Sequence, residues 1–144
     1  PRRASWMAFA GPATNIALVL IGGLCIRLGM SAGVFNAPES VSVPEIVEAT
    51  RSGVWESAAL VLGMLVCLNL VLTVLNLIPL PPLDGNGVLA IFLSEDAARR
   101  WNEMTANPMF SMAGLLIAWH FFGPLFELVL NAALMVLYPD VRYF

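Results

Sequence analysis

The sequence contains no lysine and little charge of either sign. All seven basic residues are arginine, ten residues are acidic, and charged residues make up 12% of the 144 residues. The formal net charge of −3 leaves no basic surface of the kind that binds nucleic acid, so we expect no nucleic-acid partner. A soluble globular domain has roughly a quarter of its residues charged. This scarcity of charge argues against a soluble protein.

Histidine and cysteine are also scarce. His120 is the only histidine, and the two cysteines, Cys25 and Cys67, lie far apart in separate apolar runs. Widely spaced cysteines in such runs are typical of packing residues rather than of a disulfide or a metal pair. Hydrophobic residues, in contrast, make up 59% of the chain, and the mean hydropathy is +0.81. Composition therefore predicts an integral membrane protein in contact with a lipid bilayer.

Three apolar runs are long enough to cross a bilayer. They cover about residues 6–27, 57–78 and 108–138, and a helix of about 20 residues spans a hydrocarbon core of ~30 Å. Gly123-Pro124 interrupts the third run, which is compatible with one kinked span or with a hairpin split at 123–124. We therefore expect an all-α, multi-pass transmembrane helix bundle that forms a single membrane-embedded domain over residues 1–144.

The polar segments between the runs carry weaker signals. Residues 30–56 are acidic and broken by prolines, and we expect a loop with one short helix over residues 44–51. Residues 94–107 predict a surface helix with Ser94 as its N-cap. The distribution of arginines favours a cytoplasmic N-terminus and a cytoplasmic 94–107 loop, by the positive-inside rule.

Three prolines follow the second apolar run. Residues 75–92 read LNLIPLPPLDGNGVLAIF, so a helix that has just crossed a bilayer meets backbone that cannot remain helical. At membrane depth such backbone survives only where it is buried in protein or lines a wet cavity. Asp84 follows the prolines, and an ionisable residue at this depth indicates a functional site. On position alone, Asp84 is also a favoured N-cap for a helix that begins just after it.

Two motifs resemble one protein family. Residues 76–85, NLIPLPPLDG, resemble the Asn-x-x-Pro…Leu-Asp-Gly signature of the site-2 protease family, whose members are zinc metalloproteases that cut within the membrane. Residues 10–15, AGPATN, resemble the Gly-Pro-x-x-Asn helix of the compact, mostly prokaryotic branch of that family. The two motifs occur in the family's order, and together they cover the first two-thirds of the chain.

The resemblance implies roles for individual positions. Asp84 corresponds to the carboxylate ligand of Zn²⁺, and Asn76 and Pro79 correspond to positions that hold substrate beside the metal. The extended backbone of residues 79–83 would pair with an unwound substrate by strand addition. The implied function is cleavage of a peptide bond in a membrane-embedded protein substrate, in the plasma (inner) membrane of a prokaryote. The matching near-site positions are Gly11, Pro12, Asn15 and Gly85.

One part of the family pattern is missing. The family's other two zinc ligands are the histidines of His-Glu-x-x-His, whose glutamate is the general base, on a helix before Gly-Pro-x-x-Asn. This sequence contains no such motif and so supplies no catalytic residue. We expect the chain to be a piece of a longer protein, with the motif upstream of Pro1. The alternative is a degenerate relative that binds partners without cutting them.

Two further hypotheses concern the last apolar run. His120, Glu127 and Asn131 would share one face of a continuous helix, where they either pair inside the bundle or form a polar track or a substitute metal site. A small channel or transporter built around the broken helix is the remaining alternative. It predicts a second broken helix, for which Gly123-Pro124 is the only candidate.

Overall fold

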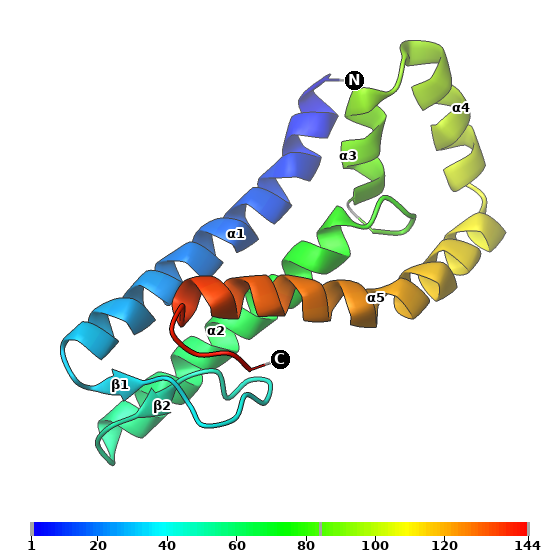
Figure 1. Ribbon diagram of the computed structural model, residues 1–144. Coiled ribbons are helices and arrows are strands. Elements are labelled where there is room, and N and C mark those ends of the chain that lie inside the picture. The colour runs from blue at the N-terminus through cyan, green and yellow to red at the C-terminus, as the bar shows by residue number, and fades with distance from the viewer. Residues whose placement is uncertain (1, 84, 144) are drawn as a thin grey trace. The chain divides into compact units, whose positions relative to one another are not determined.

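The computed structural model describes residues 2–83 and 85–143. Within these residues the chain forms five helices and one two-stranded sheet (Figure 1), which confirms the predicted all-α class. The elements are α1 (Arg2–Ser31), β1 (Phe35–Asn36), β2 (Glu48–Ala49), α2 (Val54–Leu77), α3 (Gly85–Phe92), α4 (Glu95–Thr105) and α5 (Pro108–Leu137).

Three helical segments of the described chain are long and apolar enough to cross a membrane. They are Ala10–Ser31, Val54–Leu77 and Pro108–Leu137. Each exceeds the ~20 residues that a hydrocarbon core of ~30 Å requires. Together with the apolar composition, these segments identify a membrane protein.

The chain divides into two compact units. The first, here called the loop unit, contains residues 1–15 and 72–126. The second, called the hairpin unit, contains residues 16–71 and 127–144. The single membrane-embedded domain expected from the sequence stays a prediction.

The last apolar run is one helix. α5 continues through Gly123 and contains Pro124, so the structure has no hairpin at this point. A proline inside a helix removes one backbone hydrogen bond, which transmembrane helices tolerate. A Cβ added at Gly123 would have no other atom within 4 Å, so this glycine serves no close helix contact.

Close packing in the hairpin unit depends on a glycine and an arginine of α1. A Cβ added at the buried Gly22 would lie only 2.7 Å from Val66 of α2, so the glycine lets the two helices approach. Arg27 donates from Nη1 to the carbonyl oxygen of Leu137, at 3.0 Å. That oxygen is one of the four that the end of a helix leaves unpaired, so the guanidinium caps α5 at its negative end.

The segment between α1 and α2 contains a β-hairpin, and the short helix predicted for residues 44–51 is wrong. β1 and β2 pair antiparallel, and the Thr50 N–H extends the ladder by donating to the carbonyl oxygen of Val34, at 3.0 Å. The side chain of Ile46, in the segment between the two strands, is fully buried. The β-branched residues of this segment favour extended backbone when one side is buried, and that preference outweighs the N-terminal helix signal of the proline.

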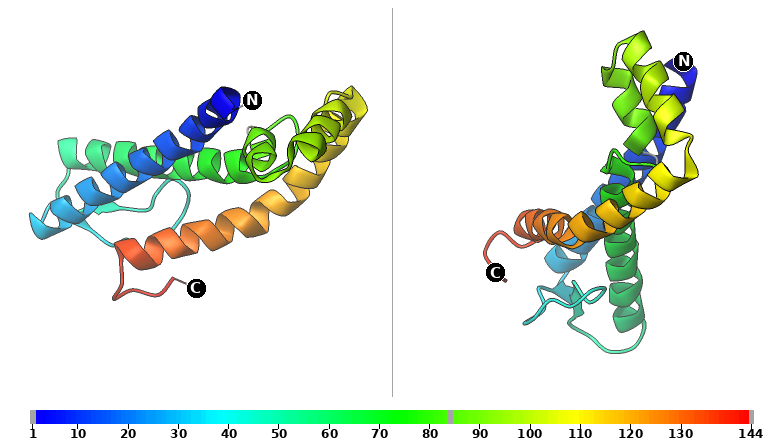
Figure 2. Two further views of the ribbon diagram at one scale, coloured as in Figure 1. Left: turned by 90° about the horizontal axis from the view of Figure 1, so that it is seen from above. Right: turned by 90° about the vertical axis from the view of Figure 1, so that its right-hand side faces the viewer.

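Two phenol groups attach the tail after α5 to the hairpin. Tyr138 donates from its hydroxyl to the carbonyl oxygen of Ile46, at 2.7 Å, and Tyr143 donates to that of Pro38, at 2.9 Å. The two rings meet edge to face, with centroids 6.1 Å apart. The tail consequently turns back along the end of α5 (Figure 2). Burial, reinforced by the neighbouring Tyr143, raises the pKa of the Tyr138 hydroxyl well above its ordinary value.

We expect the protein to lose stability as the pH rises above about 10. The unfolded Tyr138 hydroxyl ionises near its ordinary pKa of 10.0, whereas the folded one stays protonated, so unfolding releases a proton above that pH. The free energy of unfolding should then fall by up to ~1.4 kcal/mol per pH unit. Thermal unfolding in detergent, followed by near-UV circular dichroism from pH 9 to 11.5, measures the slope.

The control for this prediction is Tyr138→Phe. The variant loses a hydrogen bond worth ~1 kcal/mol at neutral pH, but it should show a shallower decline above pH 10. Equal slopes for the variant and the wild type would contradict the assignment to Tyr138.

Candidate functional site

The chain between α2 and α3 is non-helical, as predicted for the end of the second span. We call residues 78–83 the Pro loop. It is built of tight turns rather than extended backbone: the Leu80 N–H donates to the carbonyl oxygen of Ile78, at 2.9 Å, and the Leu83 N–H donates to that of Leu80, at 3.0 Å. Prolines have no N–H. These two bonds therefore use every backbone donor in residues 79–83.

Two buried glycines let backbone pack directly against the Pro loop. A Cβ added at Gly85, the first residue of α3, would overlap the carbonyl oxygen of Ile78 and lie 2.7 Å from that of Asn76. A Cβ added at Gly114 of α5 would overlap the carbonyl oxygen of Pro81. Gly85 was a predicted near-site residue. Gly114 was missed, although a glycine inside a long apolar run is itself a signal of close approach.

The side chains predicted to hold substrate flank the start of the Pro loop. Asn76 lies in the last turn of α2 and is partly buried, with its carbonyl oxygen against Gly85. Pro79 is exposed. In the α1 segment of the same unit, the predicted near-site residues are buried or partly buried, namely Gly11, Pro12 and Asn15.

A polar contact joins α3 to α4. Trp101 of α4 donates from Nε1 to Oδ1 of Asn86, the second residue of α3. The Trp101 ring also meets Phe110 of α5 edge to face, with centroids 6.0 Å apart. Nothing in the sequence pattern identifies this pair, because the two partners are fifteen residues apart and belong to different helices. The first turn of α3 is thus fixed by α4.

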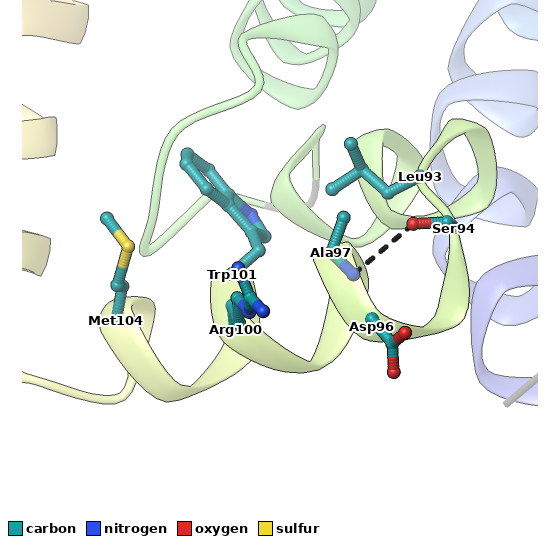
Figure 3. Close-up of a pocket in the computed structure, with 7 residues that line it drawn as sticks. All are labelled: Leu93, Ser94, Asp96, Ala97, Arg100, Trp101 and Met104. Carbon is teal, nitrogen blue, oxygen red and sulfur yellow. Dashed lines mark hydrogen bonds between the residues drawn. The ribbon is translucent and has the colours of Figure 1, made fainter.

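A hollow of about 400 Å³ lies along α4 (Figure 3). As predicted, Ser94 caps this helix, accepting a hydrogen bond from the Ala97 N–H at 3.4 Å. Asp96 is the one carboxylate in the lining, and neither histidine nor cysteine lines it, so it lacks the ligands of a metal site. The lining residues are Leu93, Ser94, Asp96, Ala97, Arg100, Trp101 and Met104.

The described residues do not fit a zinc centre. Within residues 2–83 and 85–143, no group of three or more His, Cys, Asp or Glu side chains could hold a metal ion. Asp84, the predicted ligand, lies outside the described residues. A zinc centre needs at least three protein ligands. This part of the chain does not supply them.

His120 and Glu127 do not pair inside the bundle. Both are exposed on α5, and the described part of the chain contains no ion pair with either. His120 meets the ring of Phe121 edge to face, with centroids 5.3 Å apart. Within the described residues neither the internal pairing nor the substitute metal site is seen, and the role of these side chains stays a prediction.

Comparison with known proteins places the chain in a family. Residues 1–121 match the family model described as Peptidase family M50. The match includes the Gly-Pro-x-x-Asn segment of α1, the whole of α2 and the Pro loop. Neither a curated protein nor a solved structure matched the chain.

We expect Gly85→Ala to destabilise the loop unit, because the added methyl group would overlap a backbone carbonyl that cannot move aside easily. Overpacking of this kind costs ~1–3 kcal/mol. Gly123→Ala is the matched control: it places the same methyl group in open space, and a helical alanine is preferred over glycine. Thermal unfolding in detergent compares the two. A Gly85→Ala protein as stable as Gly123→Ala would contradict the packing described here.

Proposed function

The chain belongs to peptidase family M50, the family of site-2 metalloproteases, and we propose that it forms the substrate-facing part of an intramembrane zinc protease. In this proposal Asp84 is the carboxylate ligand of Zn²⁺, and Asn76 and Pro79 contact a membrane-embedded protein substrate. The observation that carries the proposal is the Pro loop. It follows a span-length apolar helix and comes immediately before a carboxylate, in the order of the family's Asn-x-x-Pro…Leu-Asp-Gly signature.

The zinc centre requires ligands beyond the described residues. In the family, two histidines of His-Glu-x-x-His complete the ligand set, whereas this sequence contains His120 alone. No catalytic step through the metal therefore follows from this chain. Its own contribution is the shape and hydrogen-bonding capacity of the Pro loop.

In our proposal the Pro loop recognises substrate through its carbonyl oxygens. Strand addition would need both donors and acceptors from residues 79–83, but both N–H groups are used inside the loop. The carbonyl oxygens of the exposed Pro79 and Pro82 accept no hydrogen bond within the described residues. An unwound substrate segment has free N–H groups, which are costly in a water-poor site. The loop therefore accepts hydrogen bonds from an unwound substrate.

The proposal also includes the orientation of the chain in the membrane. With one crossing each by α1, α2 and α5, the N-terminus and α4 lie on the same side of the membrane. That side holds more arginines, and the positive-inside rule makes it cytoplasmic. In a prokaryote the membrane is the plasma (inner) membrane. The arginines concerned are Arg2, Arg3, Arg99 and Arg100.

A second candidate function is substrate binding without cleavage. It is favoured by the single histidine of the sequence, which lies exposed on α5. A channel or transporter has less support, because Gly123-Pro124, the candidate for its second broken helix, lies inside the continuous helix α5.

We expect Asp84→Asn in the encoded full-length protein to abolish both zinc binding and cleavage. The amide keeps the size of the carboxylate but removes its charge. Losing a residue that only orients a metal ligand costs ~10–100-fold in activity, and losing the ligand itself should reduce cleavage by more than that. The probe is a tagged single-span reporter carrying Gly-Pro within its transmembrane segment, reconstituted in vesicles. Elemental analysis reports the zinc content.

Asp140→Asn provides the control, because Asp140 is an exposed aspartate in the tail after α5. It should retain zinc and activity. A wild-type protein that binds the reporter but neither contains zinc nor cleaves would overturn the protease proposal and favour the binding function.

We expect cleavage to depend on particular backbone N–H groups of the substrate, because in our proposal the carbonyl oxygens of the Pro loop bind them. Synthetic reporter peptides in which single amides of the unwound segment become esters lose one N–H donor each. Away from the scissile bond, one or two positions should lose ~10-fold in cleavage, the effect of a single hydrogen bond. Zinc content should not change. Uniform cleavage at every ester position would contradict this contact.

A further inference from the structure

Two ionisable side chains lie near the middle of the longest membrane span. His120 comes twelve residues after the first residue of α5, and Glu127 comes ten residues before its last, so each is ~15 Å or more from the nearer end of the helix. Both side chains are exposed, and within the described residues neither has a hydrogen bond or an ion pair. Ionisable groups at this depth are costly in lipid and almost always pair or face the interior of a bundle. Their exposure indicates a face that another molecule covers.

These two side chains lie opposite the buried face of α5. The buried face is a row with a spacing of four residues, which runs from Gly114 through Ala118 to Phe126, and its members are buried or partly buried. At about 100° per residue, His120 and Glu127 lie about 160–180° around the helix from the middle of that row. α5 is one unbroken helix through this point (Figure 1), so the relation follows from helix geometry alone.

The exposed face has the residue spacing of a helix–helix contact. Exposed residues recur along it at alternating intervals of four and three, which is the a/d pattern of helices that pack side by side at ~20°. We call this row the α5 seam. Its residues are Met109, Ala113, Leu116, His120, Gly123 and Glu127, all of them exposed.

Gly123 lets another helix come close to the α5 seam. A Cβ added at Gly123 would have nothing within 4 Å, so packing inside the described chain does not require a glycine there. Glycine is less favourable than alanine in a helix, but in membrane helices small residues let backbones approach closely. Gly123 lies three residues after His120 and four before Glu127. A helix that crosses α5 at this glycine therefore comes within reach of both polar side chains.

We propose that the α5 seam is the interface of a parallel dimer, in which it packs against the same seam of a second copy of this chain. Copies inserted in one orientation form a symmetric pair in which each seam position meets its own copy. The polar positions are compatible with this symmetry. An imidazole both donates and accepts a hydrogen bond, and two carboxyl groups can share a proton, whereas lysine and arginine only donate and would repel their copies.

A second copy also fits the spacing of the polar groups. The partner helix needs two hydrogen-bonding groups ~10 Å apart along its axis, with a small residue between them. A parallel copy of α5 supplies all three at matching depths, because His120 meets His120, Gly123 meets Gly123 and Glu127 meets Glu127. This dimer requires neither zinc nor cleavage, so it does not depend on the proposed protease function.

The test is dimerisation of the encoded full-length protein in liposomes, measured by Förster transfer between donor-tagged and acceptor-tagged copies over a range of protein-to-lipid ratios. Gly123→Leu places a side chain in space that is open within the chain and should abolish the specific transfer. Ala132→Leu, at an exposed position of α5 outside the seam, should not. A wild type that is monomeric at every ratio would overturn the proposal, because an upstream segment, another protein or lipid would then cover the seam.

Disulfide cross-linking tests the register of the dimer. In a background with Cys25 and Cys67 changed to alanine, Leu116→Cys should form a disulfide with a second copy on oxidation. Leu128→Cys, which is exposed but lies off the seam, should not. A cross-link at position 128 without one at position 116 would contradict the proposed interface.

Substitutions at the two polar positions test the hydrogen bonds. His120→Leu and Glu127→Leu should each weaken dimerisation by ~3- to 10-fold, the effect of a hydrogen bond between membrane helices. Glu127→Gln should still dimerise, because an amide both donates and accepts. Both leucine variants should be at least as stable to heat as the wild type in detergent, which separates lost dimerisation from misfolding. Unchanged dimerisation in both, or an equal loss in Glu127→Gln and Glu127→Leu, would contradict the proposed pairs.

Discussion

Backbone polar groups at membrane depth must find partners inside the protein, and the Pro loop meets this constraint by having few donors. Three of its six residues are prolines, which lack an N–H. Of the three remaining N–H groups, that of Ile78 donates back to Leu75 of α2, and those of Leu80 and Leu83 close tight turns within the loop. A break in a membrane helix normally exposes donors and acceptors together. Here the break exposes acceptors alone. That asymmetry limits the partners of the loop to molecules that donate hydrogen bonds.

Close contact around the loop depends on missing side chains. Gly85 and Gly114 bring α3 and α5 against loop carbonyls at distances that no Cβ would permit. The neighbouring Asn86 then receives a hydrogen bond from Trp101, which ties the start of α3 to the surface helix α4. A charged, partly exposed helix outside the family motifs therefore fixes the residues that follow Asp84. A change on α4 can reach the proposed site through this contact.

The sequence predicted those features that local chemistry determines. Apolar run length located the spans, the prolines located the break in the second span, and Ser94 located the start of α4. It failed where distant partners decide the backbone. Residues 44–51 carry a helix-start signal but contain β2, which pairs with β1. The Pro loop has extended-backbone residues but folds into turns. The contact of Gly114 with the loop joins residues more than thirty positions apart. Nothing in a single sequence indicates which of two such distant segments meet, or at which residues.

An unpaired acceptor has different consequences in water and in a bilayer. Water satisfies an unpaired acceptor on a soluble protein at little cost, so the acceptor carries no information about ligands. In a bilayer the same acceptor must be matched by protein, by an ordered water or by a bound molecule with a donor. The carbonyls of Pro79 and Pro82 lack donors within the described chain. They stand close in sequence to the family's signature carboxylate, so the partner that fits them best is an unwound peptide, whose free N–H groups supply the missing donors.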